Sequence, residues 1–221
     1  MEKELQKRII SSLVLIPTAL FFIIKGSIFF IFFLSVCFLI TSYEWHQMSK
    51  NKSYNIPGHF FLVISFYFAY LWRHYLSLDA ELFLFVILIC VSTDIGGYTI
   101  GKIFKGPKLT KISPNKTYTG VLGGYLFTFI ILLTFLYYDF YFSIISIDTG
   151  LDLYNITLIL VISTVSQLGD ITISYFKRLS NKKNTGNLIP GHGGILDRID
   201  GMIFAFPIIY IIYFHEYGFW F

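Results

Sequence analysis

The stretch GVLGGYLFTFIILLTFLYY, residues 120–138, carries no charged side chain along its whole length. About 20 apolar residues in a helix cross the ~30 Å hydrocarbon core of a bilayer. The 221-residue chain repeats this pattern: 55% of it is hydrophobic, 20% aromatic and 14% charged, whereas soluble domains average roughly 25% charged. A soluble fold could not bury so much apolar surface. The sequence therefore predicts an all-α, polytopic integral membrane helical bundle.

Apolar segments recur along the chain and predict seven spans, plus or minus two because several segments are short. The fourth is too short unless it extends back into residues 76–80 or beyond Asp94. The charged amino terminus leads into a run without a cleavage site, which favours a retained first span over a signal peptide. The candidate spans are Ile9–Ile24, Ser27–Tyr43, Pro57–Trp72, Leu82–Thr93, Gly120–Tyr138, Leu153–Leu168 and Ile199–Phe214.

The distribution of basic residues predicts the orientation. If the amino terminus is cytoplasmic, 15 of the 17 Lys and Arg residues lie inside, and Lys25 and Arg73 lie outside. The positive-inside rule then places the protein in the cell inner (cytoplasmic) membrane with a cytoplasmic amino terminus. Two long polar loops, residues 94–119 and 169–198, face the cytoplasm and form a polar cleft. We divide the chain into N-terminal transmembrane helices, residues 1–89, and a catalytic membrane domain, residues 90–221.

One face of the helix entering the second loop is polar. The polar residues on this face are spaced at helical intervals and extend from the membrane interior to the surface. The carboxylate on this face lies near the membrane boundary, where an unpaired charge is costly. We favour a metal or substrate ligand over the alternative of a packing carboxylate held by a lysine. The face comprises Ser163, Gln167, Asp170, Ser174 and Lys177.

A glycine-rich turn lies within LIPGHGGILDRIDG, residues 188–201. Glycines let backbone amides approach a ligand closely, as phosphate-binding loops do. The alternative is a glycine-rich connector leading into a charged helix start. The candidate residues of this turn are Gly191, His192, Gly193 and Gly194.

Two more carboxylates follow the turn. A helix starting near Ile195 places Asp197 and Asp200 three residues apart on one face. Together with Asp170 they form a hard-oxygen site suited to Mg²⁺. Arg198 is off that face and pairs with a phosphate or with a carboxylate.

Cations accompany the carboxylates in both loops. In the second loop they attract anionic lipid or neutralise a polyphosphate, and both interpretations stay open. The first loop offers a compact set of donors around Pro114. The cations are too few and too close to the membrane for nucleic-acid binding. The second-loop cations are Lys177, Arg178, Lys182 and Lys183, and the first-loop donors are Lys111, Ser113, Asn115, Lys116 and Thr117.

These features suit Mg²⁺-assisted phosphoryl or nucleotidyl transfer between a soluble nucleotide and a lipid. The sequence offers no Ser-His-Asp arrangement or thiol nucleophile, which disfavours covalent catalysis. The small-residue pairs Gly97/Gly101 and Gly120/Gly124 allow close helix approach and permit, without requiring, a homodimer.

Several motifs together resemble the signature of the phosphatidate cytidylyltransferases, the CDP-diacylglycerol synthases. The similarity covers roughly residues 90–205, and the amino-terminal spans match only in being hydrophobic. The chain departs from the family at Asn184 and Thr119, where relatives commonly carry acidic residues. The matching stretches are DIGGY (94–98) with GK (101–102), ISPNKT (112–117) with Gly120, SQLGD (166–170), SYFKR (174–178) with Lys183, and PGHGGILDRID (190–200).

The resemblance implies the reaction CTP + phosphatidate → CDP-diacylglycerol + pyrophosphate, a step of phospholipid biosynthesis, with Mg²⁺ as cofactor. The number of Mg²⁺ ions and the presence of a monovalent cation stay open. The predicted catalytic residues are Asp170, Lys177, Arg178, Lys183, His192, Asp197, Arg198 and Asp200, of which Asp170, Asp197 and Asp200 hold metal. The predicted substrate-binding residues are Asp94, Lys111, Ser113, Asn115, Lys116, Thr117, Gln167, Ser174, Gly191, Gly193 and Gly194.

Two other functions fit some of the same residues. A CTP-dependent polyprenol or lipid-alcohol kinase would need a base, for which Asp94 and His192 are the candidates. An ion-coupled transporter would use Asp94, Asp170 and Asp200 inside the membrane. The absence of an internal repeat and the crowding of charge on one face argue against the transporter.

Overall fold

The computed structural model describes residues 2–76, 80–110, 112–142, 153–191 and 193–217. Within these ranges the regular structure is helical, and the β-structure consists of two isolated bridges. The predicted all-α fold is confirmed. The elements are α1 (Glu2–Lys25), α2 (Ser27–Ser49), α3 (Asn55–Leu71), the π-helix η1 (Trp72–Leu76), α4 (Ala80–Phe104), α5 (Tyr118–Phe142), α6 (Leu153–Leu179), α7 (Leu196–Ile199) and α8 (Met202–Tyr217).

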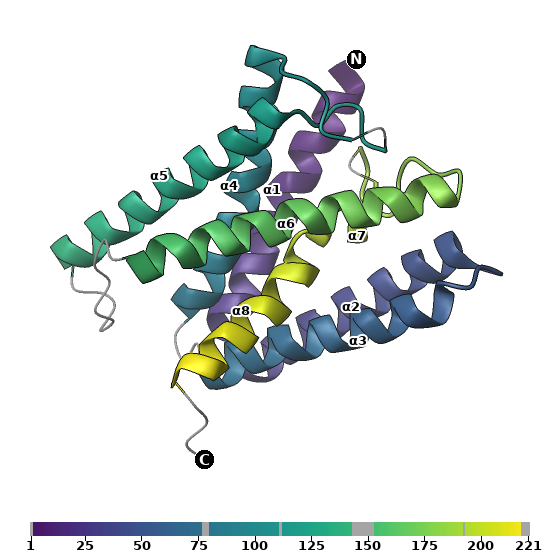
Figure 1. Ribbon diagram of the computed structural model, residues 1–221. Coiled ribbons are helices and arrows are strands. Elements are labelled where there is room, and N and C mark those ends of the chain that lie inside the picture. The colour runs from purple at the N-terminus through teal and green to yellow at the C-terminus, as the bar shows by residue number, and fades with distance from the viewer. Residues whose placement is uncertain (1, 77–79, 111, 143–152, 192, 218–221) are drawn as a thin grey trace.

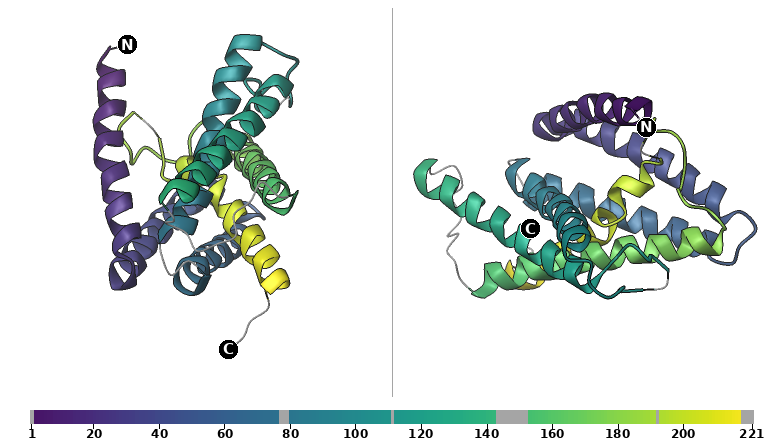
Figure 2. Two further views of the ribbon diagram at one scale, coloured as in Figure 1. Left: turned by 90° about the vertical axis from the view of Figure 1, so that its left-hand side faces the viewer. Right: turned by 90° about the horizontal axis from the view of Figure 1, so that it is seen from above.

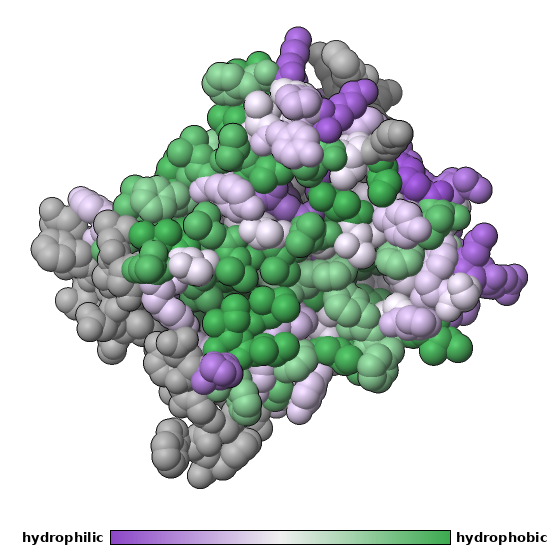
Figure 3. Space-filling view, viewed as in Figure 1, coloured by the Kyte–Doolittle hydropathy of each residue, from purple (hydrophilic) through white to green (hydrophobic). Residues whose placement is uncertain are grey.

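Five of the described helices are long and apolar enough to cross a membrane, and the apolar part of α8, Met202–His215, is shorter. Hydrophobic side chains cover most of the face in Figure 3, while hydrophilic ones gather along one edge. Exposed apolar surface of this extent needs lipid as its solvent. The chain is a multi-pass membrane protein. The five helices contain the segments Gln6–Lys25, Ser27–Ser49, Ala80–Phe104, Tyr118–Tyr137 and Leu153–Leu179.

Three predicted boundaries were wrong. The second polar loop was expected from residue 169, but α6 continues to Leu179. The first polar loop was expected from Asp94, but α4 continues through Asp94 to Phe104, so the loop is confined to residues 105–117. A helix was expected to start near Ile195, and the last span was expected at Ile199–Phe214. Instead α7 ends at Ile199, and α8 begins after Asp200 and Gly201. The third difference coincides with close packing, because Gly201 leaves room for Ser166 of α6.

The α4–α5 pair shows this packing most clearly. A Cβ atom added at Gly96 would collide with the carbonyl oxygen of Gly123, and one at Gly101 would lie 3.3 Å from the Cα of Gly120. Small residues therefore bring the two backbones into direct contact, as in small-residue helix pairs of membranes generally. Much of the glycine surface that would permit a homodimer is therefore already covered by the contact between α4 and α5.

The core lies where α8 crosses α3, α4 and α6 (Figures 1 and 2). Its most deeply buried side chains include Ile89, Ile159, Ile162 and Ala205, each at most 1% exposed. A second apolar cluster, around Leu196 and Trp45, joins α2, α3, α6, α7 and α8. The α2–α3 and α6–α7 connections meet through the Tyr54 and Ser180 hydroxyls, and the α4–α5 connection meets α6 through Lys116 and Asp170. We call this end of the bundle the loop end (Figure 1).

Helix α1 stands at the margin of the bundle. It turns into α2 at Gly26, whose φ of 63° suits glycine. Its amino-terminal part stands apart from α4 and α5 in Figure 2, whereas Ile23 near its other end is buried in the main core. Near its amino-terminal end, the Ser11 hydroxyl donates a 3.2 Å hydrogen bond to the Pro190 carbonyl of the α6–α7 connection. An apolar groove of about 390 Å³ along α1 is lined by Arg8, Ile9, Ser12, Leu13, Ile16 and Pro17.

Candidate active site

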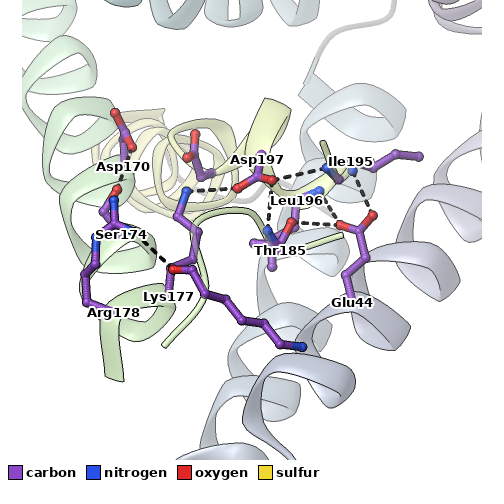
Figure 4. Close-up of polar contacts among 12 residues, drawn as sticks. Glu44, Asp170, Ser174, Lys177, Arg178, Thr185, Ile195, Leu196 and Asp197 are labelled. Carbon is purple, nitrogen blue, oxygen red and sulfur yellow. Dashed lines mark hydrogen bonds and ion pairs between the residues drawn. The ribbon is translucent and has the colours of Figure 1, made fainter. Parts of the chain in front are cut away.

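The polar face of α6 meets the α4–α5 loop at the loop end. Lys116, from that loop, forms a 2.5 Å ion pair with Asp170 on α6. The Ser174 hydroxyl donates to the other carboxylate oxygen of Asp170 at 3.2 Å (Figure 4). Lys116 also lies 3.5 Å from the carbonyl oxygen of Gln167. The structure therefore brings predicted residues of both polar loops onto one carboxylate.

Asp200 lies beside Asp170 because two glycines let α6 approach the α7–α8 turn. A Cβ added at Gly169 would lie 2.7 Å from the Asp200 carbonyl oxygen, and one at Gly201 would collide with the Ser166 hydroxyl. Asp200 is 6% exposed. Its carboxyl group, when protonated, donates a hydrogen bond to Asp170. These two carboxyl groups form what we call the carboxylate pair.

Burial raises the pKa of Asp200 well above its ordinary value, and the neighbouring Asp170 charge raises it further. Lys177 acts in the opposite direction, whereas Asp94 on α4 adds to the increase. Two carboxylates this close disfavour simultaneous ionisation unless a cation compensates them. The carboxylate pair is therefore a place where a divalent cation would relieve repulsion.

Asp197 points to different partners. One oxygen accepts a 2.8 Å hydrogen bond from the Lys177 ammonium group, and the other accepts from the backbone amides of Thr185 and Gly194 at 2.9 and 3.1 Å. The Lys177 and Asp197 side chains are 10% and 7% exposed. Asp197 thus ties the end of α6 to the glycine-rich turn, while Asp170 lies on the other side of Lys177 (Figure 4).

The glycine-rich turn is closed by its own backbone. Ile189 and Gly193 exchange two amide–carbonyl hydrogen bonds of 2.9 and 3.2 Å. Gly191 and Gly193 have φ angles of 78° and 91°, which favour glycine. The amide of Gly194 donates to Asp197. Two of the amides that the sequence suggested for phosphate binding, those of Gly193 and Gly194, therefore have partners inside the protein.

Glu44 on α2 is a buried carboxylate that the sequence analysis did not include. It is 3% exposed. One oxygen accepts from the amide of Ile195 at 2.9 Å; the other accepts from the amide of Leu196 at 2.8 Å and from the Thr185 hydroxyl at 3.1 Å. An acidic residue inside a mostly apolar helix was the available signal, because membranes tolerate one only with partners.

The other predicted residues are placed as follows. Thr117 accepts from the Gly120 amide at 3.0 Å and so caps α5, and Ser113 forms a backbone turn with Lys116. Exposed positions include Asp94, Asn115, Arg178, Lys183 and Arg198. Lys111 and His192 lie outside the described residues. Two positions differ from the family pattern. At these positions, the Thr119 hydroxyl accepts from the Gly106 amide at 3.2 Å, and Asn184 is exposed beside Gly193.

The donor set fits a Mg²⁺ ion bound with its substrate. Within the described ranges, no three His, Cys, Asp or Glu side chains gather as a ready-made metal cage. Mg²⁺ is commonly held by one or two carboxylates together with substrate phosphates and water. The carboxylate pair offers that number of ligands, and Lys116 and Lys177 lie beside it as cations for phosphate.

The fold and the site define a class: a multi-pass helical membrane protein with carboxylates and lysines gathered at one end of the bundle. The family model described as "Cytidylyltransferase family" matches residues 6–81 and 61–215. The chain belongs to the cytidylyltransferase family and is a nucleotidyltransferase. The match begins at residue 6, so the similarity is not confined to residues 90–205 as expected, and it includes the helix that carries Glu44.

The names of similar proteins agree with this family assignment. The chain is 37% identical over 187 residues to a phosphatidate cytidylyltransferase of Staphylococcus aureus (strain COL). The aligned region covers 81% of this chain and 67% of the relative. Phosphatidate cytidylyltransferases of Staphylococcus haemolyticus (strain JCSC1435) and Staphylococcus saprophyticus are 32% and 34% identical over the same shares. Family membership favours nucleotidyl transfer over the kinase and transporter alternatives.

Proposed function

We propose that this chain transfers the cytidylyl group of CTP to phosphatidate with Mg²⁺, releasing pyrophosphate and leaving CDP-diacylglycerol in the membrane. The carboxylate pair, with Lys116 and Lys177 beside it at the end of membrane-spanning helices, is the observation that carries the proposal. The names of the relatives supply the two substrates.

The chemistry is a displacement at phosphorus. An oxygen of the phosphatidate phosphate bonds to the α-phosphorus of CTP, and the bond from that phosphorus to the β-phosphate oxygen breaks. The bonding electrons leave with pyrophosphate. A phosphomonoester has a second pKa of about 6, so the attacking group is largely dianionic near pH 7 and needs little help from a base. The difficulty is to hold two anions in line.

The residues divide this work. Asp170 and Asp200 would hold Mg²⁺, which when bound neutralises the polyphosphate and the charge that develops on pyrophosphate. Lys116 would exchange its ion pair with Asp170 for a phosphate. Lys177 is held between Asp197 and the carboxylate pair and would contribute fixed positive charge. Asp197 as a third ligand stays a proposal, and it would have to release Lys177 and two amides.

We place the loop end in the cytoplasm and the protein in the cell inner membrane. CTP would then reach Arg178, exposed in the last turn of α6, and Lys183, exposed on the loop that follows, while the lipid keeps its acyl chains in the bilayer. The lysines and arginines favour this orientation, since 15 of 17 fall on one side.

Labelled CTP tests the proposal. The purified protein is incubated with phosphatidate in detergent micelles, with and without Mg²⁺, using CTP labelled at the α- or the γ-phosphate. Label from the α-phosphate should enter the lipid, and label from the γ-phosphate should leave as pyrophosphate. Entry of γ-label into lipid, or no Mg²⁺-dependent lipid labelling, would refute the proposal.

Two variants locate the site in the same assay. Asp200→Asn removes a proposed ligand and should lower turnover by about 100-fold or more, since a bound metal is worth several kcal/mol in the transition state. Glu81→Gln makes the matching change in the first turn of α4, ahead of Asp94 by half the helix, and should leave turnover unchanged. Equal turnover of Asp200→Asn and the natural protein would contradict the metal assignment.

A further inference from the structure

Glu44 is a buried feature of the loop end that the proposed reaction does not use. It lies on α2, in the region that the sequence analysis assigned to N-terminal transmembrane helices, and it is separated by 151 residues from Ile195. Its hydrogen-bond partners in the described part of the chain are donors, two backbone amides and one hydroxyl. A buried carboxylate keeps its place in an apolar surrounding when such donors satisfy it.

The glycines around Glu44 point to a fixed arrangement rather than a chance contact. A Cβ added at Gly186 would lie 2.8 Å from a Glu44 carboxylate oxygen, and one at Gly194 would lie 2.7 Å from the carboxyl carbon. The loop therefore passes on two sides of this carboxylate with no room for a side chain. Glycine at both positions admits Glu44 to the loop backbone.

Thr185 connects Glu44 to Asp197. Its hydroxyl donates to Glu44 and its backbone amide donates to Asp197, while Gly194 and Ile195 donate to Asp197 and Glu44 respectively. The two carboxylates thus hold opposite strands of the loop between residues 185 and 196. Leu196, fully buried beneath them, packs against Trp45 of α2 in the second apolar cluster.

The same contacts fix the direction of the carboxylate pair. Leu196 begins α7, a single turn that ends one residue before Asp200. Further contacts join α2 and the α2–α3 turn to the start of the α6–α7 connection: the Lys182 ammonium group donates to the Gln47 carbonyl at 2.8 Å, and the Tyr54 and Ser180 hydroxyls lie 2.8 Å apart. Glu44 is therefore the buried anchor on which α7, and with it Asp200, is oriented.

We infer that Glu44 is a positioning residue of the active site, which orients α7 through the amides of Ile195 and Leu196 and the Thr185 hydroxyl so that Asp200 faces Asp170. The inference rests on the proposed function for its effect on turnover, and on the structure alone for its effect on the loop. The amino-terminal helices then complete the site instead of serving as a membrane anchor.

Two measurements test the two parts separately. Hydrogen–deuterium exchange on the detergent-solubilised protein follows the amides of residues 185–196 and needs no substrate. Lipid labelling from α-labelled CTP, with Mg²⁺ varied, gives turnover and the half-saturating Mg²⁺ concentration. The variants are Glu44→Gln, which replaces one acceptor oxygen by a donor, Thr185→Val, which removes the hydroxyl, and Thr185→Ser, which restores it.

In Glu44→Gln the protected amides of Ile195 and Leu196 should exchange about tenfold faster or more, because a hydrogen bond to a charged group is lost. Turnover should fall about ten- to hundredfold, and half-saturating Mg²⁺ should rise about tenfold. Thr185→Val should show the same changes to a smaller degree, and Thr185→Ser should reverse them. A purely structural residue would change the amount of folded protein and leave the Mg²⁺ requirement as it was.

Glu81→Gln is the matched control and should alter neither exchange nor turnover. Unchanged exchange at residues 185–196 in both Glu44→Gln and Thr185→Val would overturn the inference. Faster exchange with natural turnover and Mg²⁺ requirement would also overturn it, because the loop would then not orient Asp200. If the natural protein labels no lipid, the proposed function fails, while the exchange experiment still decides whether Glu44 holds the loop.

Discussion

Replacing Asp200 by asparagine should stabilise the metal-free protein relative to the natural one, and this difference should increase as the pH rises. Asp200 is buried and faces the Asp170 carboxylate, so its pKa in the folded protein lies well above its ordinary value. Asparagine resembles the protonated acid: it is neutral, similar in size, and able to donate the hydrogen bond to Asp170. The variant therefore keeps the contact and removes the ionisation.

The sign of the pH dependence follows from proton linkage. Below about pH 4 the carboxyl group of Asp200 is protonated in both the folded and the unfolded chain, and its ionisation costs nothing. As the pH rises through the ordinary value toward the raised folded pKa, the folded protein holds the proton that the unfolded chain has lost. The free energy of unfolding decreases over this interval and stays reduced above it. The asparagine side chain of the variant does not ionise, so the advantage of the variant grows from about pH 4 up to the raised pKa of folded Asp200.

The size of the stability difference depends on how far the pKa of Asp200 in the folded protein lies above its value in the unfolded chain. Each tenfold decrease in the acid-dissociation constant of folded Asp200 corresponds to about 1.4 kcal/mol at high pH. A chain of this size shifts its unfolding temperature by about 2–4 °C per kcal/mol. We expect Asp200→Asn to unfold about 3–6 °C above the natural protein at about pH 8 for each such tenfold step, with little difference near pH 4.

Thermal unfolding in detergent with EDTA, followed by tryptophan fluorescence at about pH 5 and about pH 8, measures this difference. Asp197→Asn is the matched control: it leaves Lys177 buried without its partner, and should lower the unfolding temperature at both pH values. Added Mg²⁺ should stabilise the natural protein at the higher pH and not Asp200→Asn. The reasoning is refuted if Asp200→Asn unfolds at or below the natural temperature at the higher pH, or if the difference does not vary with pH.

Three further outcomes check the packing, the ion pair and the orientation. Lys177→Met should cost about 3–5 kcal/mol of unfolding free energy by leaving Asp197 uncompensated, and a loss under about 1 kcal/mol in denaturant titration would show that the pair is not buried as described. Gly201→Ala should destabilise by about 1–3 kcal/mol through its collision with the Ser166 hydroxyl, and Ser166→Ala in the same chain should recover part of that loss, whereas no recovery would count against this contact. Asn51→Cys, in the α2–α3 turn of a chain lacking other cysteines, should resist a membrane-impermeant thiol reagent in intact cells and react after lysis; labelling in intact cells would reverse the proposed orientation.

The sequence by itself determined the solvent, the class of fold and much of the site composition. Hydrophobic runs long enough to cross a bilayer predict helices in lipid, because every backbone group must find its partner within the helix. The motif around Asp197 and Asp200 and the polar face bearing Asp170 also follow from local order. The motif and the polar face together predicted which residues gather at one end of the bundle.

Only the tertiary structure decided how those residues are paired. Asp197 and Asp200 are three residues apart, yet α7 ends between them, so one faces Lys177 and the other faces Asp170. That break depends on how closely α6 packs against Gly201, which no local pattern encodes.

Glu44 shows the same limit at longer range. Its partners lie more than 140 residues away in the sequence, and nothing in an isolated helix indicates which loop will satisfy its carboxylate. Helical periodicity is local and can be read along the chain, whereas the partners of a buried charge are set by packing between segments that meet only in the folded bundle.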